Sequence, residues 1–467
     1  EDDMFNTEQG FMDALYGIYV NMGKSDLYGG TLQTALDMTA QYYSYYDISE
    51  CPYGHYQTFE YEHPSCTAIS DALWMRIYYC IGLTNNLLKY LDKPEAVQIC
   101  SNYDYLRGEA LALRAYLHFE LIRIFAPDVK KNPEYKSIPY RKTFSPDIEP
   151  QLKVKEVYQE ILADLTEAKQ LLSNDVIRTN GPDWLGESEK KEESDDVTDK
   201  NEGYYTSDFL KTRKYRMNYY AVLGTLARVH LTLGTTDDME KAYDYAMEVI
   251  ESGKFRPIQE EHILVSGEQA KYRDILFTDE FIFGLYSAQV DAFYKSNFDE
   301  SYGVKKILIN KLSDIYGQGT RDLRQTHWFK TSWGTSYLLK HNADLEYAKE
   351  KVRMITLAEM YYIAAEAHPA EAYDLLEEIL PSREIHSSLP VNAGRTEVLT
   401  EVLKEYRKEY IGDGQFFYAY KRLIEEEAAI HPLGIFRMKI KFWYGLYHRM
   451  KLNMGTGNPE FGKLKNK

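Results

Sequence analysis

The segment from Tyr215 to Gly253 most constrains the fold of this chain, because it is typical of two helices joined by a short turn. In its first half, apolar residues recur every three or four positions, the spacing that stacks side chains on one face of an α-helix. These residues are Tyr219, Val222, Leu226, Val229 and Leu233. Gly234 ends the helix, and a second amphipathic helix follows as far as Gly253. Two helices this short cannot bury both apolar faces on each other, so the pair predicts further pairs stacked beside it.

The same periodicity predicts further helices at residues 8–22, 70–91, 104–125, 154–172, 354–367, 372–380, 396–410 and 416–427. Residues 280–286 predict a short strand, and the turn from Arg321 to Arg324 predicts an ion-pair link between lobes. The helices form about four pairs separated by unequal insertions, close to the 34-residue spacing of tetratricopeptide repeats.

We therefore expect a mainly α fold, a tetratricopeptide-like helical-pair scaffold with a long-loop lobe and a short C-terminal β-hairpin. The whole chain, 1–467, is expected to be one unit. The scaffold is placed at residues 5–26, 67–175, 204–253 and 351–427, and the lobe at 27–66, 176–203 and 254–350. The hairpin is placed at 433–455, where apolar and basic residues alternate.

Composition excludes several classes of function. A formal charge of -17 argues against nucleic-acid binding, which needs a clustered basic surface, and it gives no attraction to anionic membranes. No run of 18 apolar residues is present to span a bilayer. Phosphate-binding, dinucleotide-binding, nucleophile-elbow and zinc-protease motifs are missing, so we predict no cofactor, no metal and no catalytic residue. The 72 carboxylates leave room for the acid pair of a glycoside hydrolase, although no pattern marks one.

Scattered histidines and cysteines carry little functional signal. His118 and His230 fall within amphipathic helices and are expected to be hydrogen-bonded between helices. The spacing of the four cysteines fits no zinc site, and it leaves a bridge between Cys51 and Cys66 open. The long acidic insertion at residues 187–202 is expected to be a solvated loop.

Tyrosine is the unusual component, with 42 residues against 19 phenylalanines and 5 tryptophans. A tyrosine ring offers a flat apolar face with a hydroxyl at its edge, which suits sugar rings and peptides. Residues 27–66 show no sustained period and are predicted to be an ordered loop, and loops of this length are usually functional. This loop holds Tyr42, Tyr43, Tyr45, Tyr46, Tyr53, Tyr56, Phe59 and Tyr61. The alternative is that these rings pin the loop to the scaffold.

Several segments, taken in order, match a known pattern. They are GFMDALYGIY at 10–19, WMRIY at 74–78, RGEALALRAYLHF at 107–119, IPY at 138–140, ILADL at 161–165, RMITLAEMY at 353–361 and GDGQFF at 412–417. The ordered set, from about Phe5 to Arg422, resembles the SusD/RagB family of bacterial surface lipoproteins. Two departures mark a divergent member, because Asp413 stands where a glutamate is usual and the basic hairpin replaces a proline-rich close. The family's α-glucan cargo is therefore not assumed.

The resemblance implies a binding protein without enzymatic activity, lipid-anchored at the outer-membrane surface of Bacteroidetes. It implies a SusC-type TonB-dependent transporter as partner, to which the protein passes oligosaccharide or peptide and for which it acts as a lid. The chain begins at Glu1 without a methionine or signal peptide, so we expect a mature or trimmed chain with the lipidated cysteine just ahead of it. An extracytoplasmic address is compatible with a bridge between Cys51 and Cys66.

The resemblance also places ligand binding on the 27–66 loop and on insertions before the late helices, which carry Trp333 among other aromatics. The candidate ligand-binding residues are Tyr42, Tyr43, Tyr45, Tyr46, Tyr53, Tyr56, Tyr294, Tyr302 and Trp328. Trp74, Tyr78 and Asn85 are assigned to the core or to helix capping. Glycan capture is the leading hypothesis; the alternatives are a binder of peptide or protein cargo, a scaffold that binds only the transporter, and an α/α-type glycoside hydrolase.

Overall fold

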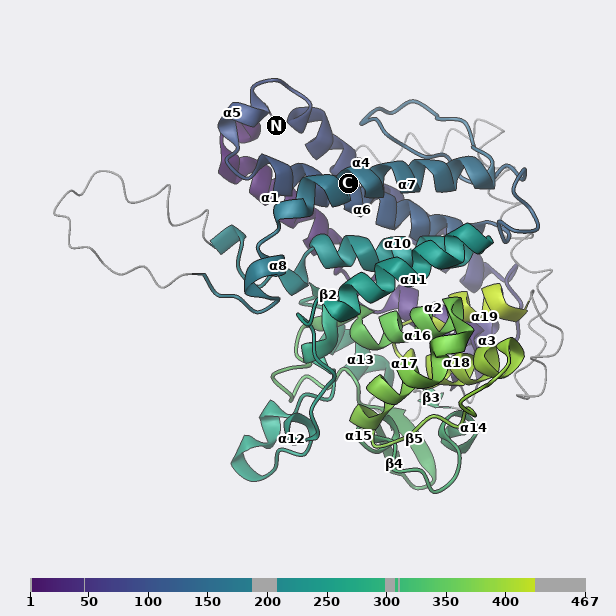
Figure 1. Ribbon diagram of the computed structural model, residues 1–467. Helices are drawn as coiled ribbons and strands as arrows, with labels where there is room; N and C mark the ends of the chain where they lie inside the picture. Colours follow the sequence, from purple (N-terminus) through teal and green to yellow (C-terminus); the bar gives the residue numbers. More distant parts are fainter. Residues whose placement is uncertain (1, 46, 187–207, 299–306, 310, 425–467) are drawn as a thin grey trace.

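The computed structural model describes residues 2–45, 47–186, 208–298, 307–309 and 311–424, and the chain is mainly helical (Figure 1). Four predicted features lie outside the described residues: Tyr46, Tyr302, the acidic insertion at 187–202 and the hairpin at 433–455. The long helices are α1 (Glu8–Met22), α4 (Pro64–Leu91), α6 (Tyr103–Phe125), α7 (Val154–Leu171), α10 (Tyr219–Leu233), α11 (Thr236–Glu251), α16 (Leu357–Ala367), α17 (Ala372–Ile379), α18 (Arg395–Glu409) and α19 (Phe416–Ile424).

These helices stack in series, as the periodicity predicts. Helix α1 packs on α4, α4 on α6 and α6 on α7, and α7 continues to α10. Helices α10 and α11 form the predicted hairpin, α11 packs on α16, and α16 contacts both α17 and α18 (Figure 1). The fold class predicted from sequence, mainly α with helical pairs, is confirmed for the described chain.

The α10–α11 hairpin is bounded by local signals that the sequence shows directly. The Asn218 side chain accepts a hydrogen bond from the backbone N–H of Ala221 and caps α10. Gly234 ends that helix at a φ of +67°, a left-handed conformation that glycine adopts without steric cost. Thr235 then caps α11 by accepting from the N–H of Asp238. Both helix boundaries follow from residue type alone.

Helix α6 lies at the centre of the array and is buried on all sides rather than along one stripe. Its buried charged groups have partners: Glu109 accepts from Arg213 and Arg216, and Arg114 donates two hydrogen bonds to Asp164, at 2.7 and 2.8 Å.

Both helix histidines are hydrogen-bonded. His118 Nε2 accepts from the backbone N–H of Arg141 at 3.0 Å, and its Nδ1 lies 2.8 Å from the Arg114 carbonyl oxygen. His230 Nδ1 lies 2.7 Å from Asp238. Both histidines are therefore hydrogen-bonded, as predicted, and His230 bonds to the neighbouring helix. The interhelical bond predicted for His118 is wrong, because its partners lie on its own helix and in the loop at Arg141.

The predicted helix at 354–367 is wrong in its first three residues. Strand β6 (Lys351–Thr356) precedes α16 and pairs antiparallel with β2 (Phe281–Tyr286), the strand that the sequence predicted. Strand β6 is buried on both faces from Val352 onward, with Arg353 among its apolar residues, so Met354 and Ile355 look like the start of the apolar stripe of the helix that follows. The partner strand, about 70 residues earlier, decides the conformation.

Residues 27–66 are more regular than predicted. They contain helices α2 (Thr31–Thr39) and α3 (Gly54–Gln57) and the short strand β1 (Tyr43–Ser44). Every residue of α2 after Thr31 is buried, including the polar residues Gln33, Asp37 and Thr39, so the polar positions of this short helix do not mark a solvent-exposed face. It is anchored by Asp37, which accepts hydrogen bonds from the N–H groups of Gly412 and Gly414 and from the Tyr43 hydroxyl.

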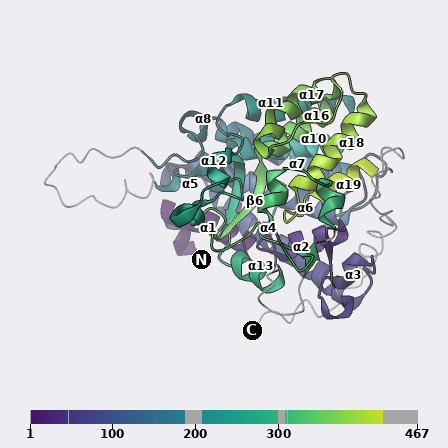
Figure 2. The same cartoon turned by 90° about the horizontal axis from the view of Figure 1, so that it is seen from below.

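The remaining elements are short and lie largely between α11 and α16. They are α5 (Ala96–Ile99), α8 (Ile177–Asn180), α12 (Glu260–Ile263), α13 (Val290–Phe298), α14 (Leu312–Tyr316), α15 (Leu323–His327), β3 (Leu308–Ile309), β4 (Phe329–Ser332) and β5 (Thr335–Leu338). Strand β1 pairs with β3, and β4 pairs with β5. The described strands, each two to six residues long, therefore form separate two-stranded ribbons rather than one sheet. Figure 2 shows β6 near the middle of the molecule, with α2 and α3 together on one side.

A buried ion network joins the 321–324 turn to the late helices. Arg324, with no solvent exposure, donates to Asp322, Glu405 and Glu409 at 2.7–2.9 Å. Glu409 also accepts from Arg353 at 2.7 Å and lies 3.3 Å from Arg383. Burial opposes ionisation of Glu409, but the three guanidiniums together outweigh it and hold the pKa of this carboxyl well below its usual value. The predicted ion pairing of this turn is confirmed.

Two further observations concern the Cys51–Cys66 bridge and membrane-spanning helices. Cys51, Cys66, Cys80 and Cys100 are all buried free thiols, so the bridge between Cys51 and Cys66 that the sequence left open is not formed. Within the described ranges, no helix combines the length and apolar character needed to cross a membrane.

Candidate functional site

The structure places most of the predicted ligand-binding rings inside the protein. Seven of the nine candidates are described, and six of these have 6% or less of their surface exposed: Tyr42, Tyr43, Tyr53, Tyr56, Tyr294 and Trp328. Their polar atoms are occupied as well. Tyr294 donates to the Gly412 carbonyl at 3.1 Å, Tyr56 contacts the Cys66 carbonyl and Ser70, and Trp328 Nε1 donates to the Ile275 carbonyl at 2.6 Å. The four of these rings that belong to the 27–66 loop favour the alternative that aromatics pin this loop to the scaffold, and Tyr294 and Trp328 are buried in the same way.

Core positions predicted from sequence behave as expected. Trp74 packs edge-to-face on Phe125, and the Tyr78 hydroxyl donates to the Pro139 carbonyl at 2.8 Å. Asn85 donates to the Arg141 carbonyl and accepts from Arg114.

The most exposed aromatic side chain on the described surface is Trp333, at 100% exposure. It stands at the tip of the β4–β5 hairpin, where Ser332 pairs with Thr335 and only Trp333 and Gly334 form the turn. Both turn residues have positive φ, +52° and +77°, which defines a type I′ turn. Asn-Gly is the preferred sequence for this turn, and a bulky residue in the left-handed region is rare.

Tyr45 is the one predicted candidate that is described and keeps part of its ring exposed. It follows β1, which pairs with β3, and β3 lies beside β5 of the hairpin that carries Trp333. The two aromatics therefore belong to one cluster of short strands, with β3, β4 and β5 together in Figure 1. Flat rings that project to solvent from a rigid hairpin can stack on the C–H face of a sugar.

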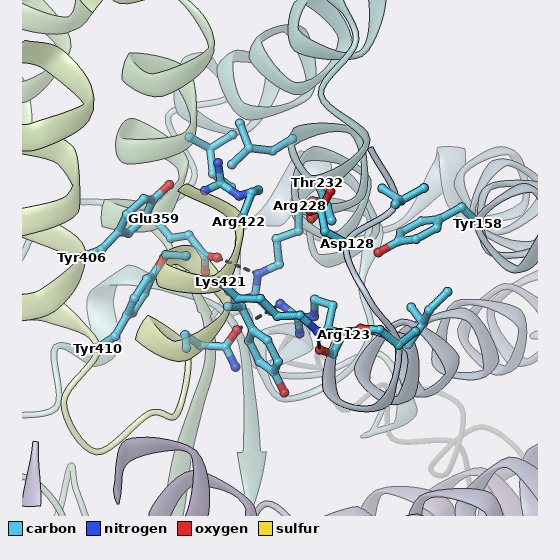
Figure 3. Close-up of a pocket in the computed structure, with 18 of the residues that line it drawn as sticks. Arg123, Asp128, Tyr158, Arg228, Thr232, Glu359, Tyr406, Tyr410, Lys421 and Arg422 are labelled. Atoms are coloured by element: carbon cyan, nitrogen blue, oxygen red, sulfur yellow. Dashed lines mark hydrogen bonds and ion pairs between the residues drawn. The ribbon is translucent and has the colours of Figure 1, made fainter. Parts of the chain in front are cut away.

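A separate pocket, partly open to solvent, lies among the helical pairs and was not predicted (Figure 3). Its volume is about 60 Å³, and its walls come from the end of α6, from α7, α10, α16 and α18, and from α19. Its polar lining includes Arg123, Asp128, Tyr158, Arg228, Thr232, Glu359, Tyr406, Tyr410, Gln415, Tyr418, Lys421 and Arg422. Arg228 and Glu359 form a bidentate ion pair, with both contacts at 2.6 Å.

The sequence analysis named Trp333 among the aromatics of the late insertions but not among the candidate residues, and it did not find the pocket. A local signal for Trp333 exists, since Ser-Trp-Gly-Thr between two short β-type runs predicts a two-residue turn with the tryptophan at its tip. The pocket residues are spread over about 300 positions, and nothing local connects them.

No group of metal-ligating side chains occurs in the part of the chain that the structure describes.

Comparisons with known proteins agree with this fold. The family model SusD-like_3, described as "Starch-binding associating with outer membrane", matches residues 12–181. The comparison with curated proteins gives no match.

Solved structures of the SusD superfamily match over most of the chain. One from Bacteroides thetaiotaomicron has 21% identity and a TM-score of 0.65, covering 89% of this chain and 88% of its own. A SusD-like carbohydrate binding protein from Bacteroides vulgatus has 19% identity and a TM-score of 0.66, covering 89% and 83%. One from Bacteroides fragilis has 20% identity and a TM-score of 0.65, covering 90% of both chains.

At these identities the structures show the shared fold, and the family model adds the sequence match. The protein therefore has the SusD-like fold. The family model, whose description names starch binding and association with the outer membrane, matches the N-terminal part of the chain, residues 12–181.

Proposed function

We propose that this protein captures a glycan at the outer-membrane surface by stacking sugar rings on Trp333, with Tyr45 contributing to the same surface. The observation that carries the proposal is a fully exposed tryptophan held in a left-handed turn position. A bulky residue there costs about 1 kcal/mol relative to asparagine or glycine, and the side chain buries nothing that offsets the strain. Strained, exposed residues at hairpin tips are typical of ligand contacts.

The proposal also includes the transport role that the resemblance implies. In it, the protein is anchored by a lipid ahead of residue 1, caps a SusC-type TonB-dependent transporter and passes oligosaccharide to it. The test is co-expression with a SusC-type transporter, which should yield a stable complex on purification. Peptide cargo remains the second candidate, since aromatic planes and hydroxyls also suit peptides.

The direct test is affinity electrophoresis of Trp333→Asn against a panel of soluble plant and host polysaccharides. Asparagine keeps the turn, so we expect a folded protein that loses retention on the polysaccharide bound by the parent chain. Tyr79→Ala is the matched control, because Tyr79 is an exposed aromatic (50%) on α4, away from the hairpin, and its loss should leave retention unchanged.

Three results would contradict the proposal. Retention of Trp333→Asn equal to that of the parent chain would remove the hairpin from the binding surface. Binding of peptides but of no polysaccharide would favour the peptide alternative. Release of shorter products from a retained oligosaccharide would establish the glycoside hydrolase alternative.

A further inference from the structure

The pocket in Figure 3 contains polar groups whose hydrogen-bonding capacity is not used. Arg123 is 8% exposed, and its Nε has no hydrogen-bond partner within the described chain. Its guanidinium is held by Glu120 at 3.1 Å, by Gln415 at 3.4 Å and by the Tyr418 ring at 3.8 Å. An unfilled donor that is fixed in this way stabilises any acceptor that enters the pocket.

Two tyrosine hydroxyls reach the pocket from opposite walls, Tyr158 from α7 and Tyr410 from the segment after α18 (Figure 3). Among the described residues neither hydroxyl makes a hydrogen bond. Burial raises the pKa of Tyr158 and that of Tyr410, so both hydroxyls keep their protons at neutral pH and can both donate and accept.

Asp128 adds an acceptor to the same wall. Its Oδ1 accepts from the N–H of Lys130 at 2.9 Å, and no ion pair with Asp128 is formed within the described chain. The pocket therefore presents donors and acceptors side by side.

The charges of the lining favour a neutral occupant. Glu359 neutralises Arg228, Glu366 forms a bidentate pair with Arg422, and Glu120 faces Arg123. Lys421 Nζ donates to the carbonyl oxygens of Arg123 and Ala126 at the end of α6. With Asp128 included, the four cations of the lining are balanced by four carboxylates. The carboxylate of Asp128 would repel a free anion that entered the pocket.

The volume limits what can enter. About 60 Å³ holds a few water-sized groups, well below the 300–1,000 Å³ of pockets that enclose a whole small-molecule ligand. A pair of neighbouring hydroxyls fits this space and this chemistry, since each hydroxyl donates once and accepts twice. Such a pair can accept from Arg123 Nε while it donates to Asp128.

We propose that this pocket is a second carbohydrate subsite, which takes the edge of a neutral sugar ring through two adjacent hydroxyl groups. It lies on the helical scaffold, distinct from the β4–β5 hairpin. The inference rests on the carbohydrate-binding function proposed above and extends it to short saccharides, with the polysaccharide held at Trp333.

The test is saturation-transfer NMR of the whole chain with glucose, galactose, mannose and N-acetylglucosamine, and with sodium acetate as the anionic comparison. The pocket variant is Asp128→Asn/Tyr410→Phe, which keeps the contact to Lys130 and removes groups that no intramolecular contact needs. We expect transfer to at least one sugar, at least tenfold weaker binding by the pocket variant, and no change in Trp333→Asn or in the matched control Tyr79→Phe.

The outcomes separate the two proposals. Absence of transfer to all four sugars, equal binding by the pocket variant, or binding of acetate alone would each overturn the subsite. If this happens while Trp333→Asn still loses polysaccharide retention, the subsite fails and the proposed function stands. Sugar transfer lost in the pocket variant but kept in Trp333→Asn supports the subsite, whatever the hairpin binds.

Discussion

Glu409 is the carboxylate on which three buried arginines converge, and its replacement by glutamine tests how far this network stabilises the fold. Arg324 would keep Asp322 and Glu405, and Arg383 would keep Glu280. Arg353 would keep only Asp413, at 3.7 Å, and would become a poorly compensated buried charge. Removing one partner of a buried pair costs about 3–5 kcal/mol, a large part of the 5–15 kcal/mol that stabilises typical proteins.

Equilibrium urea unfolding followed by circular dichroism and tryptophan fluorescence measures this loss, and coincident curves from the two probes justify a two-state treatment. The second variant is Arg353→Met/Glu409→Gln, which removes the stranded charge together with its partner. We expect it to recover part of the stability lost by Glu409→Gln alone.

The control is Asp237→Asn on α11, which breaks an exposed pair with Lys241 and should cost less than about 0.5 kcal/mol. A Glu409→Gln protein within about 1 kcal/mol of the parent chain would refute the reasoning. It would mean that water or rearrangement compensates the arginines as well as the carboxylate does.

Three further predictions follow from single residues. Trp333→Asn should raise the free energy of unfolding by about 1 kcal/mol, because it relieves the left-handed turn, and a lower thermal midpoint would contradict this. Burial lowers the pKa of His118 to about 3, against 6.5 unfolded, so the unfolded state binds the extra proton between these values. When the pH is lowered from 7 to 5, His118 should therefore reduce the free energy of unfolding by about 2 kcal/mol. His118→Gln should flatten the dependence of this free energy on pH, as measured by urea unfolding, and an unchanged slope would show that His118 is not its cause. Gly414→Ala should cost about 1–3 kcal/mol, since φ is +69° and a Cβ would lie 2.9 Å from Gln33 Cα. Gly319 has a φ of +68° with open space around it, so Gly319→Ala should cost less. Equal shifts of the thermal unfolding midpoint in the two variants would show that the contact with Gln33 has no effect.

Sequence alone determined the helical scaffold of this protein. Residues such as Val222, Leu226 and Val229 repeat with the helical period because they form the apolar face on which neighbouring helices pack, although in α10 most of the rest of the helix is buried as well. Caps at Asn218 and Gly234 are local chemistry, readable from residue type. The strand at 281–286 and the Asp322–Arg324 pair were also visible, since strand-type residues and opposite charges two positions apart can be recognised locally, whereas their distant partners cannot.

The tertiary structure decided those features that the spacing of apolar residues along the chain does not reveal. Helix α2 and strand β6 bury polar as well as apolar residues, such as Asp37 and Arg353, so polar positions in these segments do not mark an exposed face. The same limit applies to the tyrosines: composition shows that rings are abundant, but only the packing places Tyr43 and Tyr294 inside and leaves Trp333 in solvent. Pocket residues such as Arg123, Tyr158 and Tyr410 meet only because distant helices stack, which no local pattern reports.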